Sequence, residues 1–186
     1  RGTDLTRQLL SFARHRKLDV ASIDPSSLLD ATRGLLEHAL PDAIRLEVQV
    51  QPDLPLIEVD AGQLQMVLLN LLFNARDAIA GPGRIGLTVG VVGLSGEVEG
   101  LHGRFVCFQV QDSGEGIAAD VLPRIFEPFF TTKAFGKGPG LGLSQVYGFA
   151  RQSGGAISVH SVAGEGTCMQ LYLPTSHGHT HSLAHR

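Results

Sequence analysis

Apolar and polar residues alternate with a period of two along several separate segments of the chain. The alternation occurs in residues 44–51, 85–91, 106–110, 157–159 and 169–173. Because successive side chains of a strand point to opposite faces of a sheet, this period predicts strands with one buried face. A sheet of this kind is mostly antiparallel and needs helices only on its apolar face.

Other segments have apolar residues at helical spacing and predict helices over residues 25–40, 61–80 and 141–153. Asp24 and Pro25 form a typical helix start, with aspartate as the N-cap and proline at the first helical position. The pattern predicts an α/β (α+β) two-layer sandwich with a mixed, mostly antiparallel sheet and helices on one face. Residues 94–103 are expected to form a loop between two central strands.

The two ends of the chain differ from the part between them. Residues 3–17 have apolar positions at helical spacing and a basic end, which predicts one helix before the sandwich. The residues from Ser176 onward are polar and rich in histidine, as is typical of a disordered tail. We therefore expect a helical segment over 1–22, a folded domain over 23–175 and a disordered tail over 176–186.

Two asparagines, Asn70 and Asn74, interrupt the apolar run 64–79. They are separated by about one helical turn, so both amides, with Asp77 close by, lie on one face of the predicted helix. An unpartnered amide in apolar surroundings costs about 1–3 kcal/mol, so these side chains need something to bind. Asparagine oxygens suit Mg²⁺, but a buried polar contact between two helices explains the pair equally well at this point.

The composition excludes some classes of function. The chain has 186 residues, of which 43% are hydrophobic and 18% charged, within the range of soluble globular domains. Its net charge of -3 gives no electrostatic reason to bind nucleic acid or an anionic membrane. Cys107 and Cys168 are isolated from each other in sequence, which favours a reducing, cytoplasmic setting over a disulfide framework.

A second candidate site follows the strand predicted up to Gln111. Asp112 is followed by Gly114 and Gly116, so one carboxylate is surrounded by a backbone with few side chains. A carboxylate accepts hydrogen bonds and therefore favours adenine, which offers an amino group, over guanine, which offers an oxygen at the same position. A glycine turn capped by aspartate is a common alternative.

A glycine-rich segment, residues 136–144, leads into the helix predicted from Leu141. Backbone N–H groups at a helix N-terminus form a cradle for phosphates, although a simple flexible loop has the same composition. The glycine spacing fits neither a dinucleotide-binding fingerprint nor a Walker A loop. Phe126, Phe129 and Phe130 precede this segment and suit either the base of a lid or the core.

Together, these motifs and their order resemble the ATP-binding domain of sensor histidine kinases. That domain has the Bergerat ATP-binding fold and belongs to the GHKL superfamily, which includes Hsp90, DNA gyrase and MutL. The resemblance covers residues 23–174, where the asparagine motif, the two glycine motifs and the phenylalanine motif occur in the family's order. Residues 5–14 resemble the second helix of the kinase dimerisation hairpin.

The resemblance implies ATP and Mg²⁺ as ligands and gives the motif residues their roles. Asn70 and Asn74 would act in catalysis, with Asn74 as the Mg²⁺ ligand, and Asp112 would bind the adenine amino group. The implied nucleotide-binding residues are Asn74, Asp77, Asp112, Gly114, Gly116, Ile117, Phe126, Thr132, Lys133, Lys137, Gly138, Gly140, Leu141, Gly142 and Leu143.

The implied activity is transfer of the ATP γ-phosphate to a histidine on a separate hairpin. The family's phosphoacceptor histidine has no counterpart in this sequence, so we do not expect the chain to phosphorylate itself. The implied partners are that hairpin, a response-regulator receiver domain and a second copy joined through the hairpin. Pro139 removes one N–H donor from the cradle, which leaves a nucleotide-sensing module without transfer activity as an alternative.

A hydrolysing ATPase of the Hsp90 and MutL kind is the other alternative. Those relatives activate water with a glutamate one helical turn before the metal-binding asparagine. Asn70 occupies that position here, and an amide cannot act as a general base at neutral pH. The sequence therefore favours phosphate transfer over hydrolysis.

Overall fold

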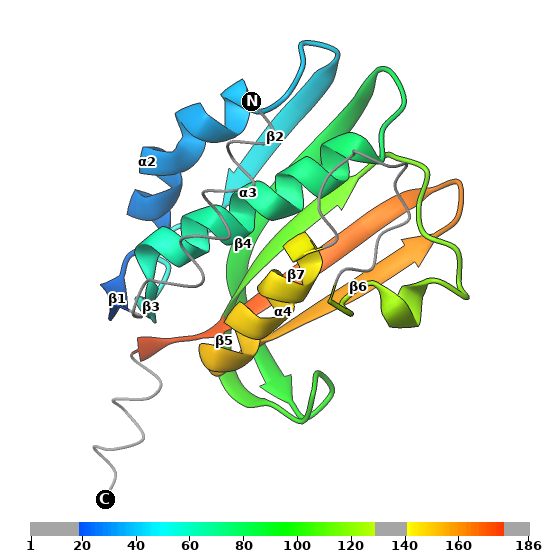
Figure 1. Cartoon of the computed structure of the whole chain (residues 1–186). Helices are drawn as coiled ribbons and strands as arrows, with labels where there is room; N and C mark the ends of the chain where they lie inside the picture. The colour runs from blue at the N-terminus through cyan, green and yellow to red at the C-terminus, as the bar shows by residue number, and fades with distance from the viewer. Residues whose placement is uncertain (1–18, 129–140, 177–186) are drawn as a thin grey trace, which may run out of the picture.

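A five-stranded sheet forms the centre of the computed structural model, which describes residues 19–128 and 141–176 (Figure 1). The predicted helix over 3–17 and all of the tail after Ser176 lie outside the described residues. In spatial order, the strands are β2 (Ile44–Val50), β4 (Gly83–Ser95), β5 (His102–Asp112), β7 (Gly166–Pro174) and β6 (Ala156–Val162).

The pairing of these strands confirms a mixed, mostly antiparallel sheet. β2 runs parallel to β4, while the β4–β5, β5–β7 and β6–β7 pairs are antiparallel. Parallel neighbours cannot be joined by a tight hairpin, so the chain crosses over between β2 and β4 through a strand and a helix.

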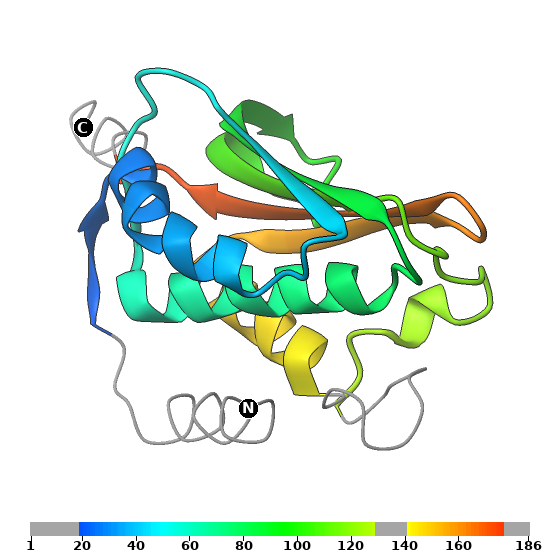
Figure 2. The same ribbon diagram turned by 90° about the horizontal axis from the view of Figure 1, so that it is seen from above.

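Three α-helices in the described residues lie on the same face of this sheet (Figure 2). They are α2 (Pro25–His38), α3 (Ala61–Asp77) and α4 (Leu141–Gln152). Asp24 caps α2 by accepting a hydrogen bond from the Ser26 N–H at 3.1 Å, and Pro25 occupies the first turn, as the sequence predicts. The two-layer sandwich with helices on one face is therefore confirmed.

The core lies between α3 and the apolar face of the sheet. The side chains of Leu64, Leu68 and Leu72 are fully buried on α3. Alternate residues of the central strands face them, among them Ile85, Leu87 and Phe108, each with an exposed fraction of 0%. The two periodicities of the sequence thus meet in one core, which fixes the position of α3 on the sheet. No helix among the described residues is both long enough and apolar enough to cross a bilayer.

Two short strands, β1 (Val20–Ile23) and β3 (Ile57–Asp60), form a small antiparallel sheet that the sequence did not predict. Ile57 forms a β-bridge to Thr175, and the Ser176 N–H donates to the Leu56 carbonyl at 2.8 Å. The prediction of disorder from Ser176 onward is therefore wrong at Ser176, which is buried because it continues the path of β7 alongside β3. β1 also spans the domain boundary expected between residues 22 and 23.

The prediction that residues 94–103 form a loop is also wrong at its two ends. The β4–β5 pairing continues to Leu94–Gly103 and Ser95–His102, so that only residues 96–101 connect the strands. The outer part of this hairpin is held by a small apolar cluster on the sheet face opposite the helices. The cluster consists of Leu94, Phe105, Cys107 and Tyr172.

Candidate functional site

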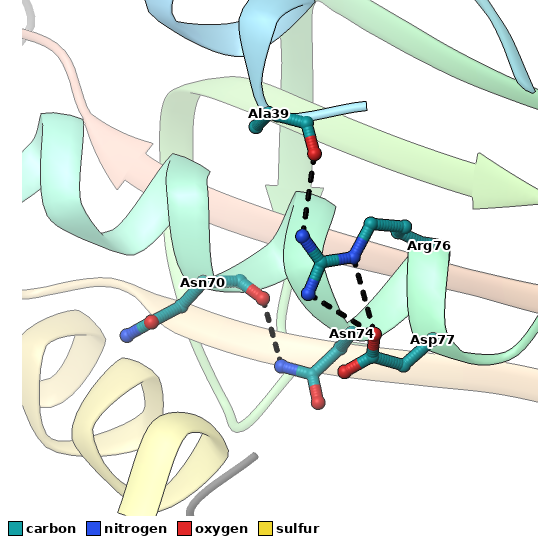
Figure 3. Close-up of polar contacts among 5 residues, drawn as sticks. All are labelled: Ala39, Asn70, Asn74, Arg76 and Asp77. Carbon is teal, nitrogen blue, oxygen red and sulfur yellow. Dashed lines mark hydrogen bonds and ion pairs between the residues drawn. The ribbon is translucent and has the colours of Figure 1, made fainter. Parts of the chain in front are cut away.

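The asparagine pair lies in the second half of α3. The helix begins at Asp60, whose side chain accepts a hydrogen bond from the Gln63 N–H at 3.1 Å. Asn70 is only 6% exposed. The Asn74 Nδ2 donates to the Asn70 carbonyl oxygen at 2.8 Å (Figure 3). Since a carbonyl only accepts, the nitrogen of the Asn74 amide faces the helix backbone and its oxygen is directed away from it.

The start of α4 lies against this asparagine pair. A Cβ atom built on Gly142 would lie 3.7 Å from the Asn74 Nδ2 and 3.9 Å from the Asn70 Cγ. The fold therefore brings together two motifs that are far apart in sequence, the asparagine motif and the end of the glycine-rich segment. The helix N-terminus that could receive phosphates is next to the amides that could bind a metal ion.

Asp77 ends α3 and is paired with its neighbour. The Arg76 guanidinium lies 3.1 Å from the Asp77 Oδ1 and donates from Nη1 to the Ala39 carbonyl at 3.3 Å (Figure 3). The same guanidinium lies over the ring of Phe73, 4.8 Å from its centroid. Arg76 thus connects the end of α3 to the end of α2 and orients the carboxylate of Asp77.

Asp112 ends β5 and is buried, with 7% of its surface exposed. Its Oδ1 accepts two backbone N–H groups, from Gly114 at 2.8 Å and from Thr167 at 3.3 Å. Burial raises the pKa of the Asp112 carboxyl, and these two hydrogen bonds oppose the shift. Both bonds that the described residues give this side chain end on Oδ1, so Oδ2 is the oxygen that can accept from a ligand.

The glycines after Asp112 lie in close contact with the backbone of other segments. A Cβ at Gly114 would lie 2.5 Å from the Ala78 carbonyl oxygen, and one at Gly116 would lie 2.2 Å from that of Val162. Gly116 also has a φ of 76°, which disfavours other residues. The space that their side chains would need is filled by the protein's own backbone. These glycines allow the loop to pack between the end of α3 and the β6–β7 turn.

The loop is held at both sides by backbone hydrogen bonds. The Glu115 N–H donates to the Ala78 carbonyl at 2.9 Å, and the Glu115 carbonyl accepts from the Gly164 N–H at 2.6 Å. The Ile117 N–H donates to the Ser161 Oγ at 2.7 Å. Asp112 is therefore positioned by α3 on one side and by the β6–β7 turn on the other.

Three further predicted site residues are partly buried and pack against the core, namely Ile117, Phe126 and Leu143. The ring of Phe126 also lies 5.6 Å from that of Tyr147 on α4, between centroids. Their packing connects the segment after the Asp112 loop to α4. It gives each of them a structural role, whether or not it contacts a ligand.

Several predicted site residues cannot be placed. Thr132, Lys133, Lys137, Gly138 and Gly140 lie outside the described residues, and Pro139 lies there too. Leu141 begins α4, and its side chain also lies outside the part that is described. The site that the structure describes therefore consists of α3, the Asp112 loop, the β6–β7 turn and the start of α4.

Two residues near Asp112, Ser161 on β6 and Thr167 on β7, were not predicted from the sequence. The Thr167 N–H donates to Asp112, and the Ser161 hydroxyl contacts that of Thr167. The flanking glycines were a signal that could have found them. Gly164 and Gly166 both have positive φ, at 85° and 115°, and a Cβ at Gly166 would lie 2.2 Å from the Asp112 carbonyl oxygen. A Gly-x-Gly-Thr segment therefore marks a turn that must approach another backbone closely.

The types of side chain in the candidate site limit which metal ion it could bind. The described residues contain no group of three or more histidine, cysteine, aspartate or glutamate side chains that could hold a metal by themselves. Mg²⁺ needs fewer protein ligands when phosphates and water complete its octahedral shell, and a neutral amide oxygen is a suitable ligand. The Asn74 amide fits a Mg²⁺ ion that enters with a nucleotide.

The chain is similar to curated proteins that are named as sensor kinases. The chain is 42% identical over 180 residues to Sensor kinase CckA of Brucella abortus (strain 2308), covering 94% of this chain and 19% of that protein. It is 37% identical over 170 residues to Sensor histidine kinase ZraS of Escherichia coli (strain K12), covering 91% of this chain and 34% of that protein. The chain thus spans between about a fifth and a third of the length of these relatives.

Among solved structures, the fold is similar to that of full-length ShkA in complex with AMPPNP. The TM-score is 0.72 at 31% sequence identity, covering 92% of this chain and 35% of ShkA. Residues 59–177 match the family described as histidine kinase-, DNA gyrase B-, and HSP90-like ATPase. This range contains the asparagine pair, the Asp112 loop, the start of α4 and the β6–β7 turn. The chain belongs to this family of histidine kinase-, DNA gyrase B- and HSP90-like ATPases.

Proposed function

We propose that this chain binds ATP with Mg²⁺ and is the catalytic domain of a two-component sensor histidine kinase. The observation that carries the proposal is the state of Asp112. It is a buried carboxylate with one oxygen held by two backbone N–H groups and the other left to accept from a ligand. Such an acid, at the end of a central strand and beside a helix with two amides, is a specific acceptor site.

Asp112 would recognise adenine through its amino group. The oxygen Oδ2 only accepts when the carboxylate is ionised, so it pairs with the adenine N6 amino group and repels the guanine oxygen at the same position. The two N–H groups on Oδ1 hold the carboxylate in one orientation. A fixed acceptor favours adenine without a rearrangement on binding.

Asn70 and Asn74 would serve the phosphate end of the nucleotide. The Asn74 Nδ2 is bonded to the helix backbone, so its amide oxygen is the atom that would hold Mg²⁺. When bound, Mg²⁺ would neutralise part of the triphosphate charge. Gly142 brings the start of α4 next to both amides, where its N-terminal N–H groups would face the phosphates.

The site favours transfer of the phosphate over its hydrolysis. Hydrolysis needs a general base to activate water, and Asn70 offers an amide at the place where a glutamate would serve. The acceptor would be the imidazole of a histidine on a separate hairpin, brought in line with the bound nucleotide. The chain's own contribution is then to position the γ-phosphate. The relatives named as sensor kinases support this activity.

Since the relatives are named as sensor kinases, we propose a phosphoacceptor hairpin and a response-regulator receiver domain as partners in the full-length protein. We also propose that the full-length protein is a dimer joined through the hairpin. On this proposal, the domain described here supplies the nucleotide site, and its partners supply the two phosphate acceptors in turn.

A reconstituted transfer reaction tests the proposed activity. The chain is mixed with a separately expressed sensor-kinase hairpin that carries the phosphoacceptor histidine, together with Mg²⁺ and ATP labelled at the γ-phosphate. We expect acid-labile label on the hairpin, and none when chelator removes Mg²⁺. A hairpin with the acceptor histidine replaced by alanine is the matched control.

Two outcomes would contradict the proposal. Tight ATP binding with no label on any tested hairpin would support a nucleotide-sensing module. Release of inorganic phosphate at the rate of a dedicated ATPase, without a hairpin, would show that Asn70 does not prevent hydrolysis.

A further inference from the structure

Ser161 lies near the end of β6, on the side of the Asp112 loop that faces the β6–β7 turn. Its hydroxyl takes part in three hydrogen bonds. It accepts the Ile117 N–H at 2.7 Å, donates to the Gly166 carbonyl at 3.0 Å, and lies 2.8 Å from the Thr167 Oγ1. A hydroxyl has one hydrogen and two lone pairs. Since its hydrogen goes to Gly166, the Thr167 hydroxyl is the donor in the third bond.

These three bonds use the full capacity of the hydroxyl and connect the two segments that hold Asp112. Ile117 comes directly after the glycine loop that begins at Asp112. Thr167 supplies one of the two N–H groups on the Asp112 Oδ1, at 3.3 Å. Ser161 therefore joins the far end of the loop to the strand that orients the carboxylate.

The backbone on each side of Ser161 packs closely, so the Asp112 loop and the β6–β7 turn have little room to move relative to each other. Gly116 lies against Val162, and Gly166 lies against the carbonyl of Asp112, both at distances that exclude a side chain. The loop and the turn are thus in direct backbone contact on each side of the Ser161 hydroxyl. Loss of the hydroxyl would leave the Ile117 N–H and the Gly166 carbonyl to find other partners in a space that is already filled.

We propose that Ser161 is a positioning residue for adenine recognition, acting through Thr167 and the Asp112 loop and not by contact with the nucleotide. The inference rests on the proposed role of Asp112 in binding the adenine amino group. Removal of the hydroxyl leaves Asp112 in place but relaxes its orientation. The loss then falls on the hydrogen bond to the amino group and spares the contacts to the phosphates.

Affinity measurements with two nucleotides test this inference. Titration calorimetry compares Mg²⁺ complexes of ATP and of purine riboside triphosphate, which lacks the amino group. For Ser161→Ala we expect ATP affinity to fall about tenfold, in line with one lost hydrogen bond to a charged group, and analogue affinity to change less than about twofold. Ser161→Thr keeps a hydroxyl at position 161, and we expect its ATP affinity to stay within about threefold of that of wild type.

Ser158→Ala is the matched control, because the Ser158 hydroxyl on the same strand donates to the Gln170 Oε1, outside the site, at 3.1 Å. We expect that variant to bind both nucleotides like wild type. Equal loss of ATP and analogue affinity in Ser161→Ala would show a general structural role and overturn the inference, as would unchanged ATP affinity.

Asp112→Ala distinguishes failure of this inference from failure of the proposed function. If Asp112→Ala binds ATP like wild type, the adenine assignment itself is wrong. If Asp112→Ala loses ATP affinity while Ser161→Ala retains it, only the positioning role of Ser161 is wrong. A thermal melt of each variant, recorded without nucleotide, confirms that the protein being titrated is folded.

Discussion

Two buried aspartates lie at opposite ends of α3, and the protein uses their oxygen atoms differently. At the start of the helix, Asp60 is 2% exposed, with Oδ1 accepting the Gln63 N–H at 3.1 Å and Oδ2 the Asp19 N–H at 2.8 Å. At the other end, where the loop after Asp112 packs against Ala78, Asp112 accepts two N–H groups on Oδ1 alone.

On the proposed function, this difference separates an acid that holds the fold from an acid that binds a ligand. A buried carboxylate with both oxygens bonded recovers the free energy that it loses on leaving water. Asp112 also accepts two N–H groups, but both are on one oxygen, and burial raises its pKa against the opposing effect of these bonds. A ligand that donates to Oδ2 would give each oxygen of Asp112 a hydrogen bond. Which oxygens of a buried carboxylate are bonded is therefore a better guide to its function than how deeply it is buried.

The largest expected effect is the loss of ATP affinity when the side chain of Asp112 is removed. Asp112→Ala is expected to lower ATP affinity by about 10- to 100-fold, because one hydrogen bond to a charged acceptor is worth about 1.5–3 kcal/mol. Titration calorimetry with Mg²⁺ present measures this loss. Asp30→Ala, an exposed acid on α2, is the control. ATP affinity within twofold of wild type in Asp112→Ala would remove the distinction between the two acids.

A converse effect is expected at the other end of α3. Asp60→Ala removes the helix N-cap and the acceptor for the Asp19 N–H, so we expect the free energy of unfolding to fall by about 2 kcal/mol. Urea unfolding followed by circular dichroism measures it. The folded fraction should bind ATP within about threefold of wild type, because Asp60 is separated from the nucleotide site by most of α3. Unchanged stability would show that the bonded carboxylate contributes nothing net.

The smallest expected effect is a dependence on pH. As the pH rises, the contribution of Asp112 to stability decreases and its contribution to ATP affinity increases. The Asp112 carboxyl has an ordinary pKa of 3.8, and the fold raises it. Its contribution to stability is therefore fully present below that ordinary value and is lost as the pH rises through the raised pKa. ATP affinity changes the other way, since the ionised form is the better acceptor, and falls as the pH drops through the raised pKa.

Asp112→Asn provides the reference for this measurement, because its amide does not titrate. ATP affinity of wild type relative to Asp112→Asn is measured by calorimetry from about pH 7 to about pH 4.5, and we expect the ratio to fall several-fold. Titration of ATP itself affects both proteins and cancels in the ratio. A ratio that stays constant over this range would place the titrating group elsewhere.

Most of the fold could be predicted from sequence because its elements are long and strongly patterned. The three helices predicted within the described residues begin at the observed residues and end within three residues of the observed ends. The strands that were missed, β1 and β3, have four residues each, too few for a clear alternation. The parallel pairing of β2 with β4 and the burial of Ser176 depend on contacts between distant segments, and no local pattern reports them.

The candidate site residues that the sequence indicates are those that conflict with their local surroundings. Asn70 and Asn74 stand out as amides in an apolar run, and Asp112 stands out as an acid before glycines. Ser161 and Thr167 were missed because a serine and a threonine are ordinary residues in a strand. The protein backbone that packs closely against Gly114 and Gly116 could not be predicted from their sequence, because it comes from distant segments.

The first and last of the described residues meet at the junction of β1, β3 and the end of β7. The Ser22 and Ser176 hydroxyls lie 3.4 Å apart there, and in Figure 1 the far end of α3 lies on the opposite side of the domain. The 17 residues of α3 extend about 25 Å from this junction. Because α3 is packed on the sheet, a rotation of the whole domain by about 10° about this junction would move the far end of the helix by about 4 Å, more than the length of a hydrogen bond.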